Sequence, residues 1–77
     1  MIKILLFAHL QEEIGQASIE IDRAELTVAE LKQWVTEAYT VSNLDQVMVA
    51  VNENYASDTD IISTGSTVAL IPPVSGG

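Results

Sequence analysis

One strong helix start constrains the fold of this 77-residue chain more than any other local signal. Thr27 and Glu30 have the spacing of a capping box, in which a hydroxyl and a carboxylate each accept a hydrogen bond from an otherwise unpaired backbone N–H group. Leu26 before the cap and Leu31 after it form the matching hydrophobic staple. The sequence therefore predicts one long helix from this point, and one helix can cover only one face of a sheet.

The residues after this start continue the helical pattern. Apolar side chains recur at helical spacing and form a stripe of Val28, Leu31, Val35 and Ala38. Trp34 flanks the stripe, and we expect it to pack within the fold together with Tyr39. Residues 39–43 are rich in β-branched and turn-forming types, which predicts the end of the helix there.

The other apolar segments predict strands. Residues 2–8 are apolar on both faces, which is typical of a central strand, whereas residues 17–22 alternate with Ile19 and Ile21 facing inward. A helical turn at residues 10–14 should end at Gly15. Further strands are expected at residues 47–51, 55–56 and 67–71, with a turn at 52–54 and an irregular segment at 58–65. The order β-β-α-β-β-β predicts an α+β fold, a mixed sheet packed on one main helix.

The composition excludes several classes of function. The chain has no cysteine, which rules out a disulfide scaffold, a thiolate metal site and a cysteine nucleophile. Three basic residues against eleven acidic ones give a net charge of −8, so neither nucleic acid nor an anionic membrane is expected as a partner. The apolar run at residues 4–8 is shorter than the roughly 7 to 15 residues of a signal core, which favours a cytoplasmic protein.

The last residues of the sequence differ from the rest. Residues 1–72 are expected to form the domain and residues 73–77 an extended tail. Pro72 and Pro73 favour a stiff, polyproline-like exit, and two terminal glycines without Cβ atoms leave the end sterically bare. Five extended residues reach about 16–18 Å, enough to enter a narrow tunnel in another protein. The alternative is an ordinary frayed terminus.

The sequence VALIPPVSGG at residues 68–77 resembles the C-terminal signature of molybdopterin synthase small subunits, the sulfur carriers of molybdenum cofactor synthesis. Further matches run through the chain in family order at residues 4–8, 27–31 and 49–52. The resemblance implies a ubiquitin-like β-grasp fold with an extended C-terminal tail.

The resemblance also implies a mechanism. A separate activating enzyme uses ATP to adenylate Gly77, and sulfur then displaces AMP to leave a C-terminal thiocarboxylate. Inside the large subunit of molybdopterin synthase, this sulfur moves to a cyclic pterin precursor and forms the dithiolene of molybdopterin. The implied assembly is a heterotetramer of two small and two large subunits. This chain binds no cofactor in that scheme, because it has no Gly-rich phosphate loop, and it is not catalytic alone.

Two groups of residues carry these roles. Gly77 would carry the reacting atom, Gly76 would give clearance in the tunnel, and Val74 with Ser75 would fix the register of the tail. The expected partner interface is an apolar patch of Phe7, Ile71, Pro72 and Pro73. Phe7 could instead be a core aromatic.

Alternative functions and sites stay open at this point. Related carriers for thiamine synthesis or tRNA thiolation, and ubiquitin-like modifiers joined through Gly77 to lysines, also end in two glycines. We discount His9, which has no nucleophile or metal-ligand companion in the sequence. Surface residues are the simpler interpretation of Glu12 and Glu13, and no metal site is expected around Asp58 and Asp60, which lack the glycine and distal glutamate of a calcium loop.

Overall fold

The long helix begins at the capping box. In this computed structural model, which describes residues 1–41 and 44–73, helix α2 (Val28–Tyr39) has Thr27 as its N-cap. The Glu30 backbone N–H donates to Thr27 Oγ1 at 3.1 Å, and the Thr27 N–H donates to Glu30 Oε1 at 2.8 Å. That second hydrogen bond lowers the pKa of the Glu30 carboxyl, because it stabilises the carboxylate. Leu26 and Leu31 are both buried, so the predicted box and staple are confirmed.

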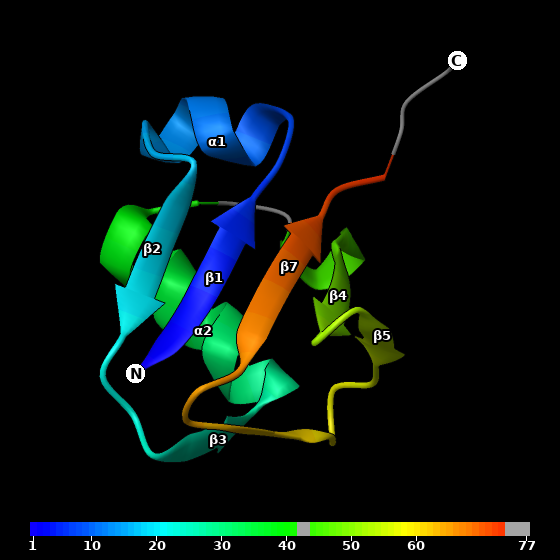
Figure 1. The fold of residues 1–77 in the computed structure, drawn as a ribbon. Coiled ribbons are helices and arrows are strands. Elements are labelled where there is room, and N and C mark those ends of the chain that lie inside the picture. The colour runs from blue at the N-terminus through cyan, green and yellow to red at the C-terminus, as the bar shows by residue number, and fades with distance from the viewer. Residues whose placement is uncertain (42–43, 74–77) are drawn as a thin grey trace.

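A mixed five-stranded sheet packs on α2 (Figure 1). The sheet order is β2-β1-β7-β4-β5, in which β1 and β7 are parallel and the other neighbours are antiparallel. The predicted α+β architecture is therefore confirmed. The elements in chain order are β1 (Ile2–Leu6), α1 (His9–Ile14), β2 (Ser18–Ile21), β3 (Glu25–Thr27), α2, the 3₁₀ turn η1 (Leu44–Gln46), β4 (Met48–Val51), β5 (Asn54–Ala56), β6 (Ile61–Ser63) and β7 (Thr67–Ile71).

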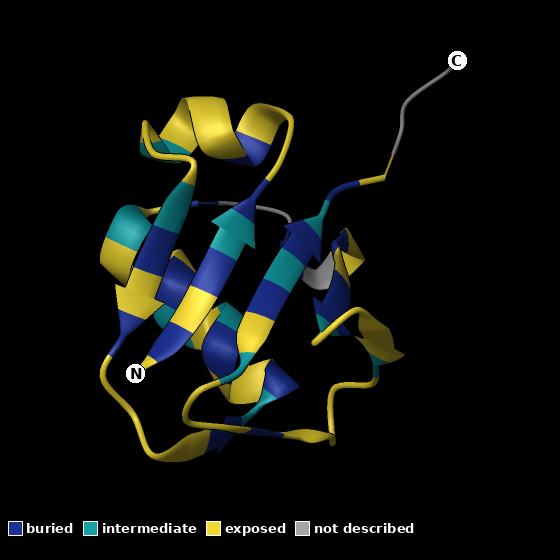
Figure 2. Cartoon of the chain, viewed as in Figure 1, coloured by how far each residue is buried: buried dark blue, intermediate teal, exposed yellow. Residues whose placement is uncertain are grey.

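The core lies between this sheet and α2. Alternate residues of β1 and β7 are buried, among them Ile4, Val68 and Leu70, and they meet the buried face of the helix (Figure 2). Ile19 and Ile21 of β2 are buried as predicted. No buried polar or charged side chain occurs among the described residues, so this core depends on apolar packing.

The predicted apolar stripe of α2 is confirmed except at its last residue, Ala38. Val28, Leu31 and Val35 are buried, and Trp34 is half-buried in edge-to-face contact with Tyr39, with 6.1 Å between ring centroids. Ala38 is exposed, because it lines an open hollow beside Trp34 that the described residues leave uncovered. Within the described residues no helix has both the length and the apolar character needed to cross a membrane.

The first strand ends earlier than predicted. β1 stops at Leu6, and Ala8 adopts φ 53° and ψ −132°, a backbone conformation that favours glycine. The chain turns there, and the Leu10 N–H donates to the Phe7 carbonyl at 3.2 Å as α1 begins. Gly15 ends α1 in the left-handed conformation, as predicted.

A second, two-stranded sheet was not predicted. β3 and β6 pair antiparallel, with Leu26 opposite the buried Ile62. The prediction that residues 58–65 are irregular is thus wrong at β6. Strands of three residues are too short to display a period of two, which explains why the sequence pattern did not reveal them.

Asn52 ties the β4–β5 hairpin to the start of β7. Its backbone N–H donates to the Thr67 carbonyl at 2.8 Å, and its Oδ1 accepts from the Thr67 N–H at 3.0 Å. Its Nδ2 also lies 3.5 Å from Ser66 Oγ. Asn52 and Glu53 both have positive φ, of 50° and 71°, as expected for the predicted turn.

We predict that Thr27→Ala lowers the free energy of unfolding by about 1 kcal/mol, because the Glu30 N–H loses its side-chain acceptor. Urea denaturation followed by the fluorescence of the single tryptophan, Trp34, measures this change. Thr36→Ala is the matched control, since Thr36 is exposed within α2. An equal loss in both variants would contradict a role for the cap.

We also predict that Asn52→Ala destabilises the protein more than Asn52→Gly does. Both variants lose the side-chain bond to Thr67, but glycine adopts the positive φ without strain. The expected loss for the alanine variant is about 1–3 kcal/mol by urea denaturation. Equal losses would show that the backbone conformation contributes nothing, and no loss in either variant would refute the side-chain tie.

Candidate functional site

The edge of the sheet where β1 and β7 both end is the first part of the candidate site. Because these strands are parallel, with Leu6 opposite Leu70, their carboxyl ends lie at the same edge (Figure 1). Phe7 follows one strand, and Pro72 with Pro73 follows the other. Residues far apart in the sequence, which were predicted to form one interface, therefore leave the sheet at the same edge.

The four predicted interface residues differ in exposure. The side chain of Phe7 is 45% exposed, and Pro73 is exposed, whereas Ile71 is half-buried and Pro72 is buried. Phe7 is thus not enclosed in the core. Pro72 offers little surface of its own, but it is the last buried residue before the predicted tail. The predicted tail residues Val74, Ser75, Gly76 and Gly77 lie outside the described part of the chain.

The sheet face opposite α2 continues this apolar surface. Pairing places Met48 beside Ile71 and Leu5 beside Ala69, and Tyr55 lies one strand further, opposite Ala50. These residues alternate with the buried ones along each strand, so they face away from the helix. We call this surface the open-face patch, which consists of Leu5, Phe7, Met48, Tyr55, Ala69 and Ile71.

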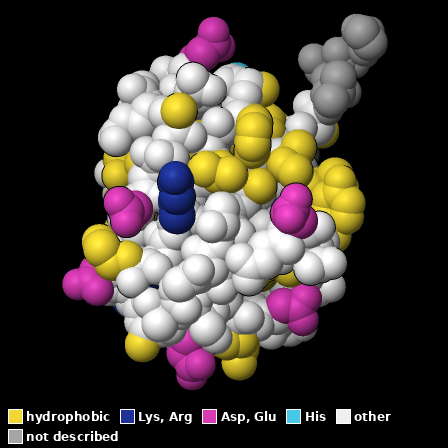
Figure 3. All heavy atoms as spheres, viewed as in Figure 1, with side chains coloured by type: hydrophobic (Ala, Val, Ile, Leu, Met, Phe, Trp, Pro, Cys, Tyr) yellow, Lys and Arg dark blue, Asp and Glu magenta, His cyan; other side chains and the backbone are white. Residues whose placement is uncertain are grey.

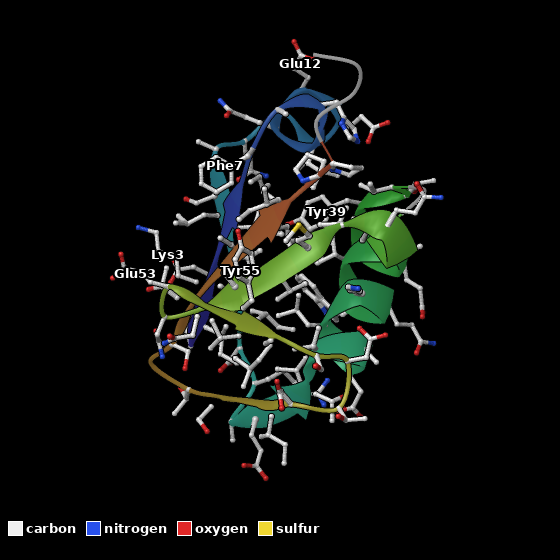
Figure 4. The ribbon with its side chains drawn as sticks, turned by 90° about the vertical axis from the view of Figure 1, so that its right-hand side faces the viewer. Lys3, Phe7, Glu12, Tyr39, Glu53 and Tyr55 are labelled. Atoms are coloured by element: carbon white, nitrogen blue, oxygen red, sulfur yellow. The ribbon has the colours of Figure 1, made fainter. Side chains whose placement is uncertain are left out.

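The views agree with this assignment. In Figure 3, hydrophobic side chains gather on the open face toward the end of the sheet where β7 finishes. In Figure 4, Phe7 and Lys3 point to the side of the sheet opposite α2. Met48 is 48% exposed and Tyr55 71% exposed. Scattered exposed apolar residues are ordinary, whereas a group of them on one face is a candidate contact surface for another molecule.

Sequence reasoning missed most of this patch. It assigned residues 47–51 to a buried strand, whereas Met48 is exposed and Val49 is buried. The sequence of β4, Met-Val-Ala-Val, is apolar at every position, so it gave no polar–apolar alternation that would separate the two faces. The pairing of Met48 with Ile71, which joins it to the patch, depends on strand register that the sequence alone did not give.

Away from the open-face patch, the described residues form an open hollow but no group that could hold a metal ion. An open hollow of about 480 Å³ lies beside α2, and its lining residues are Arg23, Glu30, Gln33, Trp34, Glu37 and Ala38. Glu30 is already engaged in the helix cap. Among residues 1–41 and 44–73, no group of three or more His, Cys, Asp or Glu side chains is placed to hold a metal ion.

The residues that we discounted lie on the surface. His9, Glu12 and Glu13 are exposed on α1. Asp58 Oδ1 lies 3.2 Å from Lys32 Nζ in a salt bridge, and Asp60 Oδ2 accepts from the Ser57 N–H at 2.7 Å. Asp58 thus has its partner on α2, and Asp60 has its partner within the loop before β6.

Comparison with known proteins identifies the family. The sequence matches the ThiS family over residues 4–77. The chain belongs to the ThiS family. Its relatives include the molybdopterin synthase sulfur carrier subunit of Dictyostelium discoideum, which is 44% identical over 81 residues covering 97% of this chain and 94% of that protein. The resemblance seen at residues 68–77 is therefore confirmed at the level of family.

Solved structures give the same fold. SAMP1 from Haloferax volcanii superposes with a TM-score of 0.85 at 28% identity, over 99% of this chain and 98% of that one. A chain of the complex of subunits 1 and 2 of molybdopterin-converting factor from Helicobacter pylori has a TM-score of 0.68 at 20% identity, over 99% and 97%. The fold of this family member is the ubiquitin-like β-grasp, as the resemblance implied.

Proposed function

We propose that this chain is the sulfur carrier subunit of a molybdopterin synthase. Support comes from family membership and from the relative with that name at 44% identity. The observation that carries the proposal is the parallel pairing of β1 with β7, which directs the chain beyond Ile71 out of the sheet at the apolar end of its open face. A carrier needs this arrangement, because the reacting end and the docking surface must reach the same partner.

The chemistry resides at Gly77. A free carboxylate is a poor acyl donor because its leaving group would be oxide, so activation must first replace that leaving group. A separate enzyme transfers AMP from ATP to the Gly77 carboxylate and releases pyrophosphate. A sulfur nucleophile then attacks the acyl carbon and expels AMP. Hydrosulfide gives the thiocarboxylate directly, whereas a persulfide donor gives an acyl disulfide, whose S–S bond a thiol must then reduce, forming a disulfide with the donor and releasing the thiocarboxylate.

The rest of the tail has a geometric role in this scheme. Gly76 leaves room in a narrow tunnel because it has no Cβ, and Val74 with Ser75 sets how far the tail enters. Pro73 stiffens the exit from the buried Pro72. The large subunit would supply the acid–base and anion-binding groups for sulfur transfer to the pterin precursor.

The open-face patch would dock on the large subunit. The Helicobacter pylori protein of the same fold occurs in a complex of two different subunits, which supports such a partner. The net charge of −8 would steer the carrier toward basic surfaces on its partners. The heterotetramer, the activating enzyme and the cytoplasmic location are predictions from the sequence and its resemblance.

A protein modifier is the second candidate. The specific observation in its favour is the similarity to SAMP1. A second similar structure, also from Haloferax volcanii, is named small archaeal modifier protein 1. Both functions begin with the same adenylate, but a modifier ends in an isopeptide bond to lysine and a carrier ends in a thiocarboxylate. Mass spectrometry of cell extracts distinguishes lysine adducts from the sulfur-loaded form.

Carriers for thiamine synthesis or tRNA thiolation would load sulfur equally. Only reconstitution with the pterin precursor distinguishes these carriers from a molybdopterin synthase subunit.

We predict that deletion of Gly77 abolishes sulfur loading while the domain remains folded. Intact mass after incubation with an activating enzyme, ATP and a sulfur donor should show replacement of one oxygen by sulfur in the wild type only. Sulfur loading by the deletion variant at the normal rate would overturn the proposed chemistry.

Gly76→Val should impair loading or transfer by crowding the tunnel.

We also predict that Phe7→Ser raises the Kd for the large subunit at least about tenfold. The substitution removes an exposed aromatic side chain at the end of the sheet where β7 finishes. Isothermal titration calorimetry measures this change. Ile61→Ser is the control, since Ile61 is 62% exposed on β6, outside the open-face patch. Equal losses in both variants, or none for Phe7→Ser, would refute docking through this patch.

A further inference from the structure

The two methionines of the chain are similarly exposed but lie in different places. Met48 is 48% exposed in the open-face patch, beside Ile71. Met1 is 60% exposed and precedes β1, where its ammonium donates to Thr64 Oγ1 at 2.8 Å. Because β1 and β7 are parallel, Met1 lies at the end of the sheet opposite Ile71 (Figure 1). One methionine is therefore in the docking surface, and the other is a built-in control.

Oxidation changes the character of such a side chain. A peroxide transfers one oxygen atom to the thioether sulfur, so that the sulfur loses two electrons and the peroxide is reduced to water or an alcohol. The product is a polar sulfoxide that accepts hydrogen bonds. Burying that oxygen against an apolar surface without a donor is unfavourable. The chain has no cysteine, so its two methionines are its only sulfur-containing side chains.

We propose that Met48 is an oxidation site that controls docking of the carrier: the thioether permits binding through the open-face patch, and the sulfoxide opposes it. This inference rests on the proposed function, since it requires the patch to be the docking surface. Docking would in turn bury Met48, so the oxidant reaches the free carrier and not the bound one. A thiol-dependent reductase would restore the thioether by oxidising two thiols to a disulfide and releasing water.

The first experiment tests the docking surface. The full-length carrier, in its carboxylate form so that no thiocarboxylate consumes oxidant, is treated with hydrogen peroxide with and without the large subunit. Peptide mass spectrometry then follows oxidation at each methionine. We expect the large subunit to slow oxidation of Met48 at least about fivefold and to leave Met1 unchanged. Equal rates at Met48 with and without the partner would overturn docking through the patch, and with it this inference.

The second experiment tests the switch itself. Wild type, Met1→Leu and Met48→Leu are oxidised, and their Kd for the large subunit is compared with that of the untreated proteins. Oxidation should raise the Kd of wild type and Met1→Leu at least about tenfold, with recovery after enzymatic reduction, and should leave Met48→Leu unchanged. Protection of Met48 without any change in Kd would overturn the switch while docking stands. An equal loss in Met48→Leu would assign the effect to another residue and would also overturn it.

Discussion

The parallel pairing of the first and last strands is the contact on which the rest of the structure depends. β1 and β7 lie side by side at the centre of the sheet, and each carries buried side chains toward α2. This pairing closes the chain on itself, so the domain cannot form until nearly all of the sequence is present. It also fixes the direction in which the residues after Ile71 leave the sheet.

A single long helix has a consequence for function as well as for stability. α2 covers one face of the sheet, and the apolar residues on the other face have no covering element among the described residues. In a larger domain a second layer would bury them. Here Phe7, Met48 and Tyr55 remain exposed, so the face that α2 does not cover provides the docking surface that we propose.

The sequence predicted the features that rest on local chemistry. The capping box at Thr27, the inward residues of β2 and the turn at Asn52 each follow from a few neighbouring residues, and the structure has them all. The features that were missed depend on distant contacts. β3 and β6 form because they meet each other, and the open-face patch is assembled by register across four strands. The turn at Ala8 was hidden because alanine rarely adopts positive φ.

The placement of β7 has a mechanical consequence. A carrier must withdraw its tail from one enzyme before it enters the next, and a pull on Pro73 that follows the direction of β7 acts along the axis of that strand. The ladder bonds on both sides of this strand run across that axis, so tension shears them together and does not open them one at a time. The hydrogen bond from the Thr67 N–H to Asn52 Oδ1, at the start of β7, resists the same displacement. The domain thus resists a pull that follows β7, because such a pull must shear the hydrogen bonds on both sides of the strand at once.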